Sequence, residues 1–463
     1  MAPHTKAFSM PLLIPGFDVV HEVAVSDGAL VFEHGWQSFS PTTAYPLGTR
    51  PHRPVSERNR MLNYRQASHP GRDGYFSEGV LAVSDGAGAV HVVAAADPFT
   101  TGVRLCASSS GSTVVISADG PVRVRASTGL PAGEDGVQAA LRDWAVTATA
   151  EAGLSEARPA PTAWCSWYEY WGDVRERDVV DNLEAVGELD LAVDVVQLDD
   201  GYSAEIGDWL TPSDRFADLR GLVERIRGEG RRAGIWLAPF FAGARSRLAD
   251  EHPDWLLRHP HGGPLHAGRN WGQDLYSLDL SHPGAADWMR SVFATFSAWG
   301  IDYFKIDFIA AGAIPGARHS GAAPVTAYRD GLRLIRDAVG TSAHILGCGA
   351  PVLPSVGLVD SIRVSADTGH TGAPDDGDMC SPSQQAAVLS ARGRQFMNGV
   401  FFANDPDCLI VGPKVESREA WAAHVEATGG AVVSSDGLRG LDGWALDTTR
   451  RLLAAAGGSP TRQ

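Results

Sequence analysis

Two rhythms of apolar and polar residues divide this chain. Up to about residue 130, short β-rich runs are separated by Gly, Asp and Pro; they cover 19–25, 30–33, 79–83, 89–94, 113–117 and 122–126. Several short strands with frequent turn signals predict an antiparallel β-sandwich. A helical pattern over 137–150 follows. The Pro-rich stretch 155–162 then predicts a boundary between an N-terminal domain, 1–155, and a second domain, 156–463.

Beyond this stretch, apolar β-rich runs alternate with helical patterns. Eight runs are candidate strands: 163–167, 193–198, 233–237, 301–306, 344–347, 361–364, 399–403 and 431–434. Helical patterns lie between most of them and after the last, at 174–186, 219–228, 285–299, 325–339, 383–398 and 441–455. This alternation predicts parallel βα units, and eight of them predict an α/β fold, the (β/α)8 TIM barrel. The fifth-to-sixth connection is short, which predicts a degenerate unit there.

Composition narrows the function classes. The chain has 463 residues, 44% of them hydrophobic, which suffices for a barrel and a smaller domain. Its net charge of -16 disfavours nucleic acid as a partner. No apolar run is long enough for a membrane span, and the N-terminus lacks a secretory pattern. Five scattered cysteines without a CxxC pair favour a reduced, cytoplasmic protein.

Polar residues follow the C-terminal end of every predicted barrel strand. Asp199 and Asp200 follow the second strand, Lys305 lies near the end of the fourth strand with Asp307 directly after that strand, and Asp367 follows the sixth. Because these strand ends meet on one face of a barrel, their polar residues predict a site there. One ionised and one protonated carboxyl group, as Asp307 and Asp367 could provide, are what a glycoside hydrolase needs. The alternative for each is an ordinary strand-end Asp that caps a loop.

Ten stretches, in order between residues 164 and 409, resemble the α-galactosidases of glycoside hydrolase family 36, in the melibiase clan. Among them are Trp164-Cys-Ser-Trp-Tyr168, Gln197-Leu-Asp-Asp-Gly-Tyr202, Tyr303-Phe-Lys-Ile-Asp-Phe308 and Asn404-Asp-Pro-Asp-Cys-Leu409. The resemblance implies that Asp307 is the nucleophile, Asp367 the general acid/base, and Asp199 and Asp200 the pair that grips galactose hydroxyls. It implies further pocket-lining positions: Trp36, Trp236, Lys305, Cys348 and Arg363. The family's C-terminal β domain is expected to be absent or vestigial.

The residues themselves add detail to these roles. Lys305 and Asp307 are two positions apart and share one face of a strand, and a nearby ammonium favours an ionised carboxylate. Asp199-Asp200-Gly201 could be a turn, but adjacent carboxylates also bind a diol. Asp208 could line the pocket or cap a loop. Tryptophans at strand ends or in loops are candidate sugar platforms: Trp36, Trp164, Trp167, Trp209 and Trp236.

The predicted function is retaining hydrolysis of terminal α-D-galactosides, with a glycoside or oligosaccharide as substrate. Alternatives are a transglycosidase with the same residues, an inert sugar-binding protein, and enzymes for α-N-acetylgalactosaminides or β-L-arabinopyranosides. No cofactor is expected, because no nucleotide-binding glycine pattern occurs. No metal is expected either: His259, His261 and His266 fall in a Gly- and Pro-containing loop. A homo-oligomer stays open.

Overall fold

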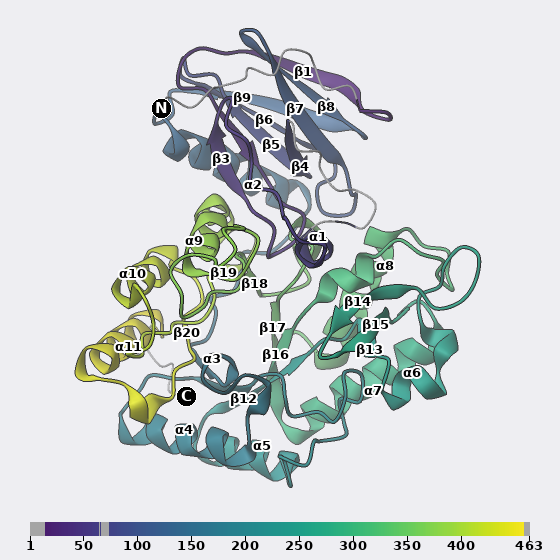
Figure 1. The fold of residues 1–463 in the computed structure, drawn as a ribbon, viewed down its shortest axis with the longest axis vertical. Coiled ribbons are helices and arrows are strands. Elements are labelled where there is room, and N and C mark those ends of the chain that lie inside the picture. The colour runs from purple at the N-terminus through teal and green to yellow at the C-terminus, as the bar shows by residue number, and fades with distance from the viewer. Residues whose placement is uncertain (1–13, 64, 66–73, 458–463) are drawn as a thin grey trace.

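A computed structural model of the protein describes residues 14–63, 65 and 74–457. Two stacked parts make up the molecule: a pair of β-sheets and, below them, a ring of parallel strands surrounded by helices (Figure 1). In the described part of the chain, no helix combines the length and the apolar character that a bilayer crossing needs.

The N-terminal part is an antiparallel sandwich. One sheet has the order β1-β8-β7-β4, formed by Asp18–Ala24, Thr113–Ala118, Arg104–Ser110 and Tyr75–Glu78. The other has the order β3-β2-β5-β6-β9, formed by Thr43–Pro46, Leu30–Glu33, Val80–Ser84, Ala89–Ala95 and Val122–Thr128. All six predicted strands occur. The analysis of the sequence missed β3, β4 and β7, whose Pro- and Ser-containing segments alternate weakly.

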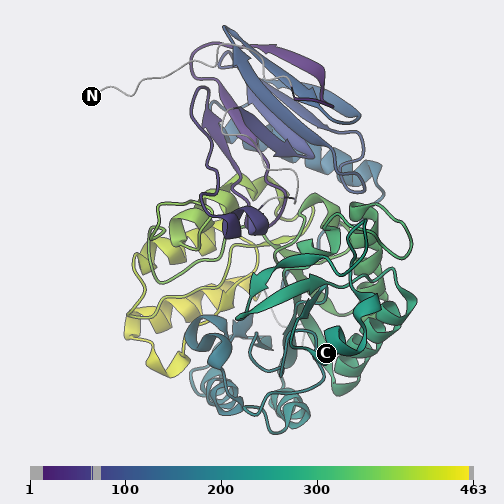
Figure 2. The same cartoon turned by 45° about the vertical axis from the view of Figure 1, so that its right-hand side comes forward.

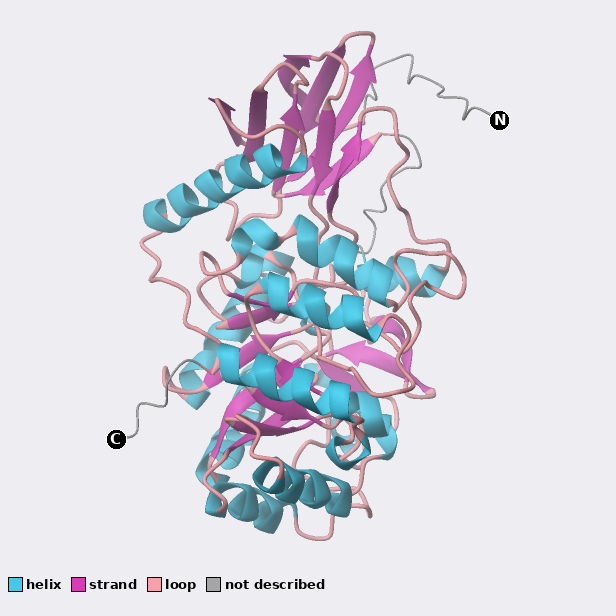
Figure 3. Ribbon diagram, turned by 90° about the vertical axis from the view of Figure 1, so that its left-hand side faces the viewer, coloured by secondary structure: helices cyan, strands magenta, loops and turns pink. Residues whose placement is uncertain are grey.

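The five-stranded sheet is buried on both faces. Its residues Val31 and Leu81 pack in the core between the two sheets, whereas their neighbours Phe32 and Ala82 pack in the core shared with the barrel. The helix α2 (Glu134–Glu151), predicted at 137–150, lies across the base of the sandwich (Figure 3). The sandwich therefore rests on the barrel through a continuous apolar core.

The barrel has eight parallel strands in the order β19-β18-β17-β16-β12-β11-β10-β20. They are Ala403–Asp405, Ser361–Arg363, His344–Gly347, Ile301–Ile306, Arg232–Leu237, Val195–Leu198, Ala163–Cys165 and Val433–Ser434. The ring closes where Ala431 N donates to Asn404 O at 2.8 Å and Leu409 N donates to Val433 O at 2.7 Å. The predicted fold class, a TIM barrel with an N-terminal sandwich, is confirmed.

One barrel strand was predicted in the wrong place. The run 399–403 leads into β19, but Gly399 has a φ of 71° and its N–H donates to Phe402 O at 2.8 Å, so a turn forms first. Phe401 in that turn packs against Phe99 and Trp144 of the sandwich. Its apolar character serves this contact between the domains and not the barrel.

Helices surround the ring: α4 (Glu176–Glu188), α5 (Leu219–Gly228), α7 (Pro283–Trp299), α8 (Pro324–Val339), α9 (Gln384–Gly393), α10 (Arg418–Thr428) and α11 (Gly443–Ala456). Only α10 was not predicted. A short 3-10 turn, Leu353–Ser355, lies between β17 and β18, which confirms the degenerate unit.

A small antiparallel sheet, missed at the sequence level, is inserted between β12 and α7. Its order is β13-β15-β14, formed by Phe241–Gly243, Gln273–Ser277 and His266–Asn270. Figure 2 shows the teal β14–β15 hairpin at the front of the barrel, below α1 (Glu57–Asn63) of the N-terminal part. His266, expected in a loop, begins β14.

Arg394, directly after α9, fastens the sandwich to the barrel. This fully buried guanidinium donates to Ser38 O at 2.6 Å and Gln37 O at 2.9 Å in the sandwich loop, and to Val364 O at 2.9 Å next to β18. Gly35 O and Ser40 O are further acceptors in the same loop. One side chain thereby fixes the loop that carries Trp36.

Candidate active site

The structure brings the predicted residues together at the C-terminal ends of the barrel strands. Asp199 and Asp200 follow β11, Trp236 lies in β12, and Lys305 lies in β16 just before Asp307. Farther round the ring, Cys348 follows β17, Arg363 ends β18, and Asp367 stands four residues later.

Asp307 is held by two neutral donors. Trp236 Nε1 donates to its Oδ2 at 3.1 Å, and the backbone N–H of Phe308 donates to its Oδ1 at 2.6 Å. Gly349 has to be glycine here, because its φ is 52° and a Cβ would lie 2.9 Å from Phe308 backbone atoms and 3.2 Å from Asp307 Oδ1. The carboxylate therefore sits in a close-fitting, oriented position.

Lys305 is the ion-pair partner of Asp199 and not, as expected, of Asp307. Its Nζ donates to Asp199 Oδ2 at 2.8 Å, and both side chains are at least 95% buried. Gln197 Nε2 donates to the same oxygen at 2.7 Å. Burial alone would raise the pKa of Asp199, but the charge of Lys305 and these donors hold it below its ordinary value. Asp199 is thus a fixed carboxylate.

Asp200, the next residue, has a different environment. Its Oδ2 accepts a hydrogen bond of 2.6 Å from Trp271 Nε1, at the tip of the β14–β15 hairpin. Burial raises the pKa of Asp200 to about 6; the Trp271 bond acts in the opposite direction, and the charge of Asp199 adds to the rise. Two neighbouring carboxylates therefore differ in basicity because one has a cationic partner and the other a neutral one.

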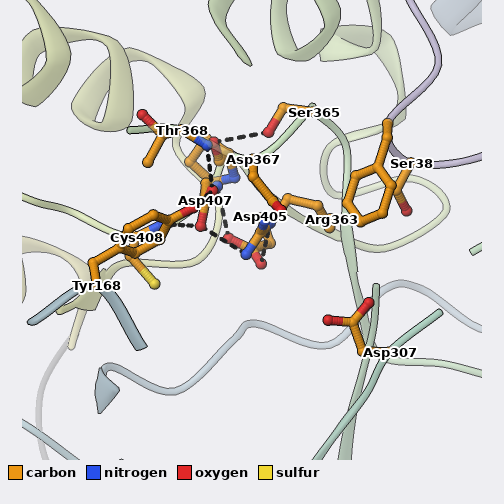
Figure 4. A network of polar contacts seen from close by, with 12 residues as sticks. Ser38, Tyr168, Asp307, Arg363, Ser365, Asp367, Thr368, Asp405, Asp407 and Cys408 are labelled. Carbon is orange, nitrogen blue, oxygen red and sulfur yellow. Dashed lines mark hydrogen bonds and ion pairs between the residues drawn. The ribbon is translucent and has the colours of Figure 1, made fainter. Parts of the chain in front are cut away.

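Arg363 is shared among three carboxylates (Figure 4). Its Nη1 lies 2.9 Å from Asp367 Oδ1, its Nε 3.1 Å from Asp405 Oδ2, and its Nη2 2.7 Å from Asp407 Oδ1. Tyr168 Oη donates to Asp407 as well. Burial alone would lower the pKa of Arg363, but the charges of Asp407 and Asp405 outweigh this effect and raise the pKa well above its ordinary value.

Asp367 is the member of this cluster that faces outward, with 40% of its side chain exposed. Its pKa is raised to about 7, first by loss of solvent around it and then by the charges of Asp407 and Asp307, against the effect of Arg363. A carboxyl group of this kind can carry a proton near neutral pH and still exchange it with a substrate.

Cys348 is buried beside Asp307, and burial raises the pKa of its thiol well above the ordinary value. A neutral thiol fits a lining position and not a nucleophile. Among the described residues, no group of three or more His, Cys, Asp or Glu is arranged to hold a metal ion.

Trp36 reaches the barrel from the sandwich of the same chain. Val352 N donates to Trp36 O at 3.1 Å, and the guanidinium of Arg65 lies 4.0 Å from the centre of the indole. The ring borders a cavity of about 430 Å³, which Trp271, Phe308 and Gly349 also line. Because Phe308 and Gly349 both contact Asp307, this cavity adjoins the carboxylate.

The structure corrects several predictions about single residues and decides between the two roles considered for Asp208. Trp164 and Trp209 are fully buried, so neither is a sugar platform. Asp208 caps the short helix Arg247–Glu251, since it accepts from the N–H groups of Arg247 and Leu248. Trp271 was missed, and Asp405 and Asp407 entered the sequence analysis only as part of the stretch Asn404-Asp-Pro-Asp-Cys-Leu409.

Comparison with known proteins supports this assembly. Residues 155–326 match the Melibiase family model. The A type blood alpha-D-galactosamine galactosaminidase of Flavonifractor plautii is 27% identical over 159 residues, which are 32% of this chain and 14% of that protein. The probable alpha-galactosidase C of Aspergillus flavus is 29% identical over 165 residues, 31% of this chain and 21% of that protein. The matches thus span less than a quarter of these curated relatives.

Solved structures extend the similarity to nearly the whole chain. The alpha-galactosidase from Thermus thermophilus, in complex with p-nitrophenyl alpha-D-galactopyranoside, superposes with a TM-score of 0.76 at 27% identity and covers 96% of this chain and 94% of that one. The GH36 alpha-galactosidase AgaA from Geobacillus stearothermophilus shares the fold, with a TM-score of 0.64 at 15% identity over 94% of this chain and 62% of that one. This chain is therefore similar to an α-galactosidase over nearly its whole length, and its residues 155–326 match the Melibiase family model.

Proposed function

We propose that this protein is a retaining glycoside hydrolase that releases terminal α-D-galactose from α-galactosides. The observation that carries the proposal is the contrast between two strand-end carboxyl groups. Asp307 is oriented by neutral donors, whereas Asp367 stands in a negatively charged cluster with a pKa of about 7. This is the division between a nucleophile and a general acid/base that double displacement requires.

In the first step, an oxygen of Asp307 attacks the anomeric carbon while the bond to the leaving oxygen breaks. Asp367 gives its proton to that oxygen, so the aglycone departs neutral and a covalent glycosyl-aspartate forms. In the second step, ionised Asp367 takes a proton from water, and the water oxygen displaces Asp307. Two inversions at the anomeric carbon return the α-anomer of galactose.

The sugar itself would be recognised by Asp199 and Asp200, which accept hydrogen bonds from O4 and O6. A buried carboxylate that is built to accept a hydroxyl rejects sugars that cannot supply it, because it is left unpaired. Around these two, Trp36, Trp236, Lys305, Cys348 and Arg363 would line the pocket. The complex of the Thermus thermophilus relative with a nitrophenyl galactoside supports this choice of sugar.

A panel of nitrophenyl glycosides tests the proposal, with NMR of the first-formed product. We expect cleavage of the α-galactoside with release of α-galactose; β-galactose as the first product would exclude double displacement. The panel includes α-N-acetylgalactosaminide and α-galactosaminide because one curated relative is a galactosaminidase. It also includes β-L-arabinopyranoside, and a sugar acceptor in the assay detects transglycosylation. A cytoplasmic location is part of the proposal, supported by five free, buried cysteines.

A further inference from the structure

The turn between β14 and β15 has an unusual residue at its tip. Asn270 pairs with Gln273, so Trp271 and Gly272 form a two-residue turn, and their φ angles are 50° and 68°. Such a turn needs left-handed backbone at both central positions, and Asn-Gly or Asp-Gly is the usual solution. A bulky indole in this conformation is strained, which directs attention to what its side chain contacts.

The indole of Trp271 contacts Asp200 on one side and the aromatic rings next to Asp307 on the other. Its Nε1 donates to Asp200 Oδ2 at 2.6 Å. Its ring meets those of Trp236 and Phe308 edge to face, with centroids 6.2 and 5.3 Å apart. Trp236 in turn donates to Asp307. Trp271 thus joins the carboxylate proposed for sugar recognition to the indole that orients the proposed nucleophile.

The hairpin tip is fastened independently of Asp200. Gln273 Nε2 donates to Glu205 Oε2 at 2.9 Å, and its Oε1 accepts from Arg245 N at 2.9 Å. Arg245 Nη2 donates to Trp271 O at 3.3 Å and its Nε to Glu205 Oε1 at 2.9 Å. Because these contacts fix the backbone of the tip, the indole N–H is a preorganised donor.

We propose that Trp271 is a positioning residue for substrate recognition, whose N–H fixes the carboxylate plane of Asp200 for a sugar hydroxyl. A carboxylate has about four acceptor sites, so one bond to the indole orients the group and leaves sites for the substrate. The inference rests on the proposed role of Asp200. It assigns to the inserted hairpin a part in sugar specificity.

Trp271→Phe tests this with minimal disturbance, because it keeps a ring and the strained backbone and removes the donor. We expect kcat/KM for nitrophenyl α-galactoside to fall about 10- to 100-fold, the range for a hydrogen bond to a charged group, with an almost unchanged Tm. Added to Asp200→Asn, the same change should cost less than about twofold, since the two act as a unit. Trp444→Phe, in a helix at the periphery, is the matched control.

A loss that multiplies with that of Asp200→Asn would overturn the proposal, as would a Trp271→Phe enzyme within about twofold of wild type. The ionisation of Asp200 supplies a readout that needs no turnover. Asp199, Asp307, Lys305 and Tyr202 stay in place, so loss of the donor alone should raise the pKa of Asp200 above about 6.

Carboxyl ¹³C NMR titration of wild type and Trp271→Phe measures this shift, with the Asp200→Asn spectrum for assignment. An unchanged titration would also overturn the proposal. If wild type cleaves no galactoside, the proposed function fails, whereas the titration still tests the contact between Trp271 and Asp200. In an active enzyme, the acidic limb of kcat/KM should move to higher pH, because the ionised form of Asp200 then appears later.

Discussion

The two sides of the barrel rim solve the problem of buried charge differently. On the side of β11, β12 and β16, each carboxylate has its own donor: Lys305 for Asp199, Trp271 for Asp200 and Trp236 for Asp307. On the side of β18 and β19, three carboxylates share Arg363. The first arrangement orients each carboxylate, whereas the second leaves more negative than positive charge around Arg363.

A surplus of negative charge holds a proton. The pKa of Asp367 is raised to about 7 first by burial and then by the charges of Asp407 and Asp307, because one guanidinium shared with Asp405 and Asp407 does not offset these effects. Under the proposed mechanism, this difference teaches that acid and nucleophile need not differ in residue type. Two aspartates would receive different tasks from the number and charge of their neighbours.

The largest expected effect follows from removing Asp307. Asp307→Gly should lower kcat on the order of 10⁴-fold or more, because no other group replaces an attacking carboxylate. Azide should restore turnover of an activated galactoside and give the β-galactosyl azide, which mass spectrometry and NMR identify. Wild-type-like turnover by the variant would refute the assignment. Far-UV circular dichroism serves as the control for folding.

Asp367→Asn should cost about 10²- to 10⁴-fold on substrates with poor leaving groups and much less on dinitrophenyl galactoside, which needs no acid. In wild type the protonated form is present below about pH 7 and is lost as the pH rises through that value. The basic limb of kcat/KM should therefore lie near pH 7 and be absent in the variant. An identical basic limb in both enzymes would contradict the assignment.

The side of Asp367 also depends on the sandwich, through the bond of Arg394 to Val364 O. Arg394→Met should lower the free energy of unfolding by about 2–4 kcal/mol, because several buried carbonyl groups lose their donor. Arg392→Met, at an exposed position in the last turn of α9, should change the free energy of unfolding by less than about 0.5 kcal/mol. Urea denaturation measures both free energies of unfolding. Equal losses would show that the hydrogen bonds of Arg394 do not account for the effect.

The smallest effect sharpens the electrostatic comparison. The charge of Asp407 raises the pKa of Asp367, so Asp407→Asn should lower it and move the basic limb of kcat/KM to lower pH. Asp287→Asn, a surface change on α7, should leave the limb in place. A shift toward higher pH in Asp407→Asn would mean that the rearranged Arg363 dominates.

Much of this molecule could be predicted because its signals are local. The β-rich runs of the barrel and the aspartates after them are contiguous in the sequence, so Asp199, Asp307 and Asp367 could be placed on one rim. Partners across the rim could not be inferred from spacing. Lys305 shares a strand face with Asp307, yet it pairs with Asp199, 106 residues away. Trp271 lies in a hairpin whose short strands alternate too weakly to predict.

Tryptophans show the same limit. Trp209 lies in the loop after β11 and Trp236 lies in β12; their rings pack edge to face at 5.9 Å, but of the two only Trp236 donates its N–H to a carboxylate. Burial of Trp209 depends on what surrounds it in three dimensions. The predicted start of β19 was wrong for the same reason, because the apolar Phe401 packs in the contact between the sandwich and the barrel.

The hydrogen bonds of Arg394 to the sandwich loop affect when the chain can finish folding during its synthesis. Its bond to Ser38 O spans 356 residues, so the sandwich loop cannot be completed until most of the barrel has left the ribosome. At about 5–20 residues per second, that wait is on the order of 20–70 s. A chaperone that covers the sandwich sheets would have to stay bound during this interval. It should dissociate when Arg394 binds the loop.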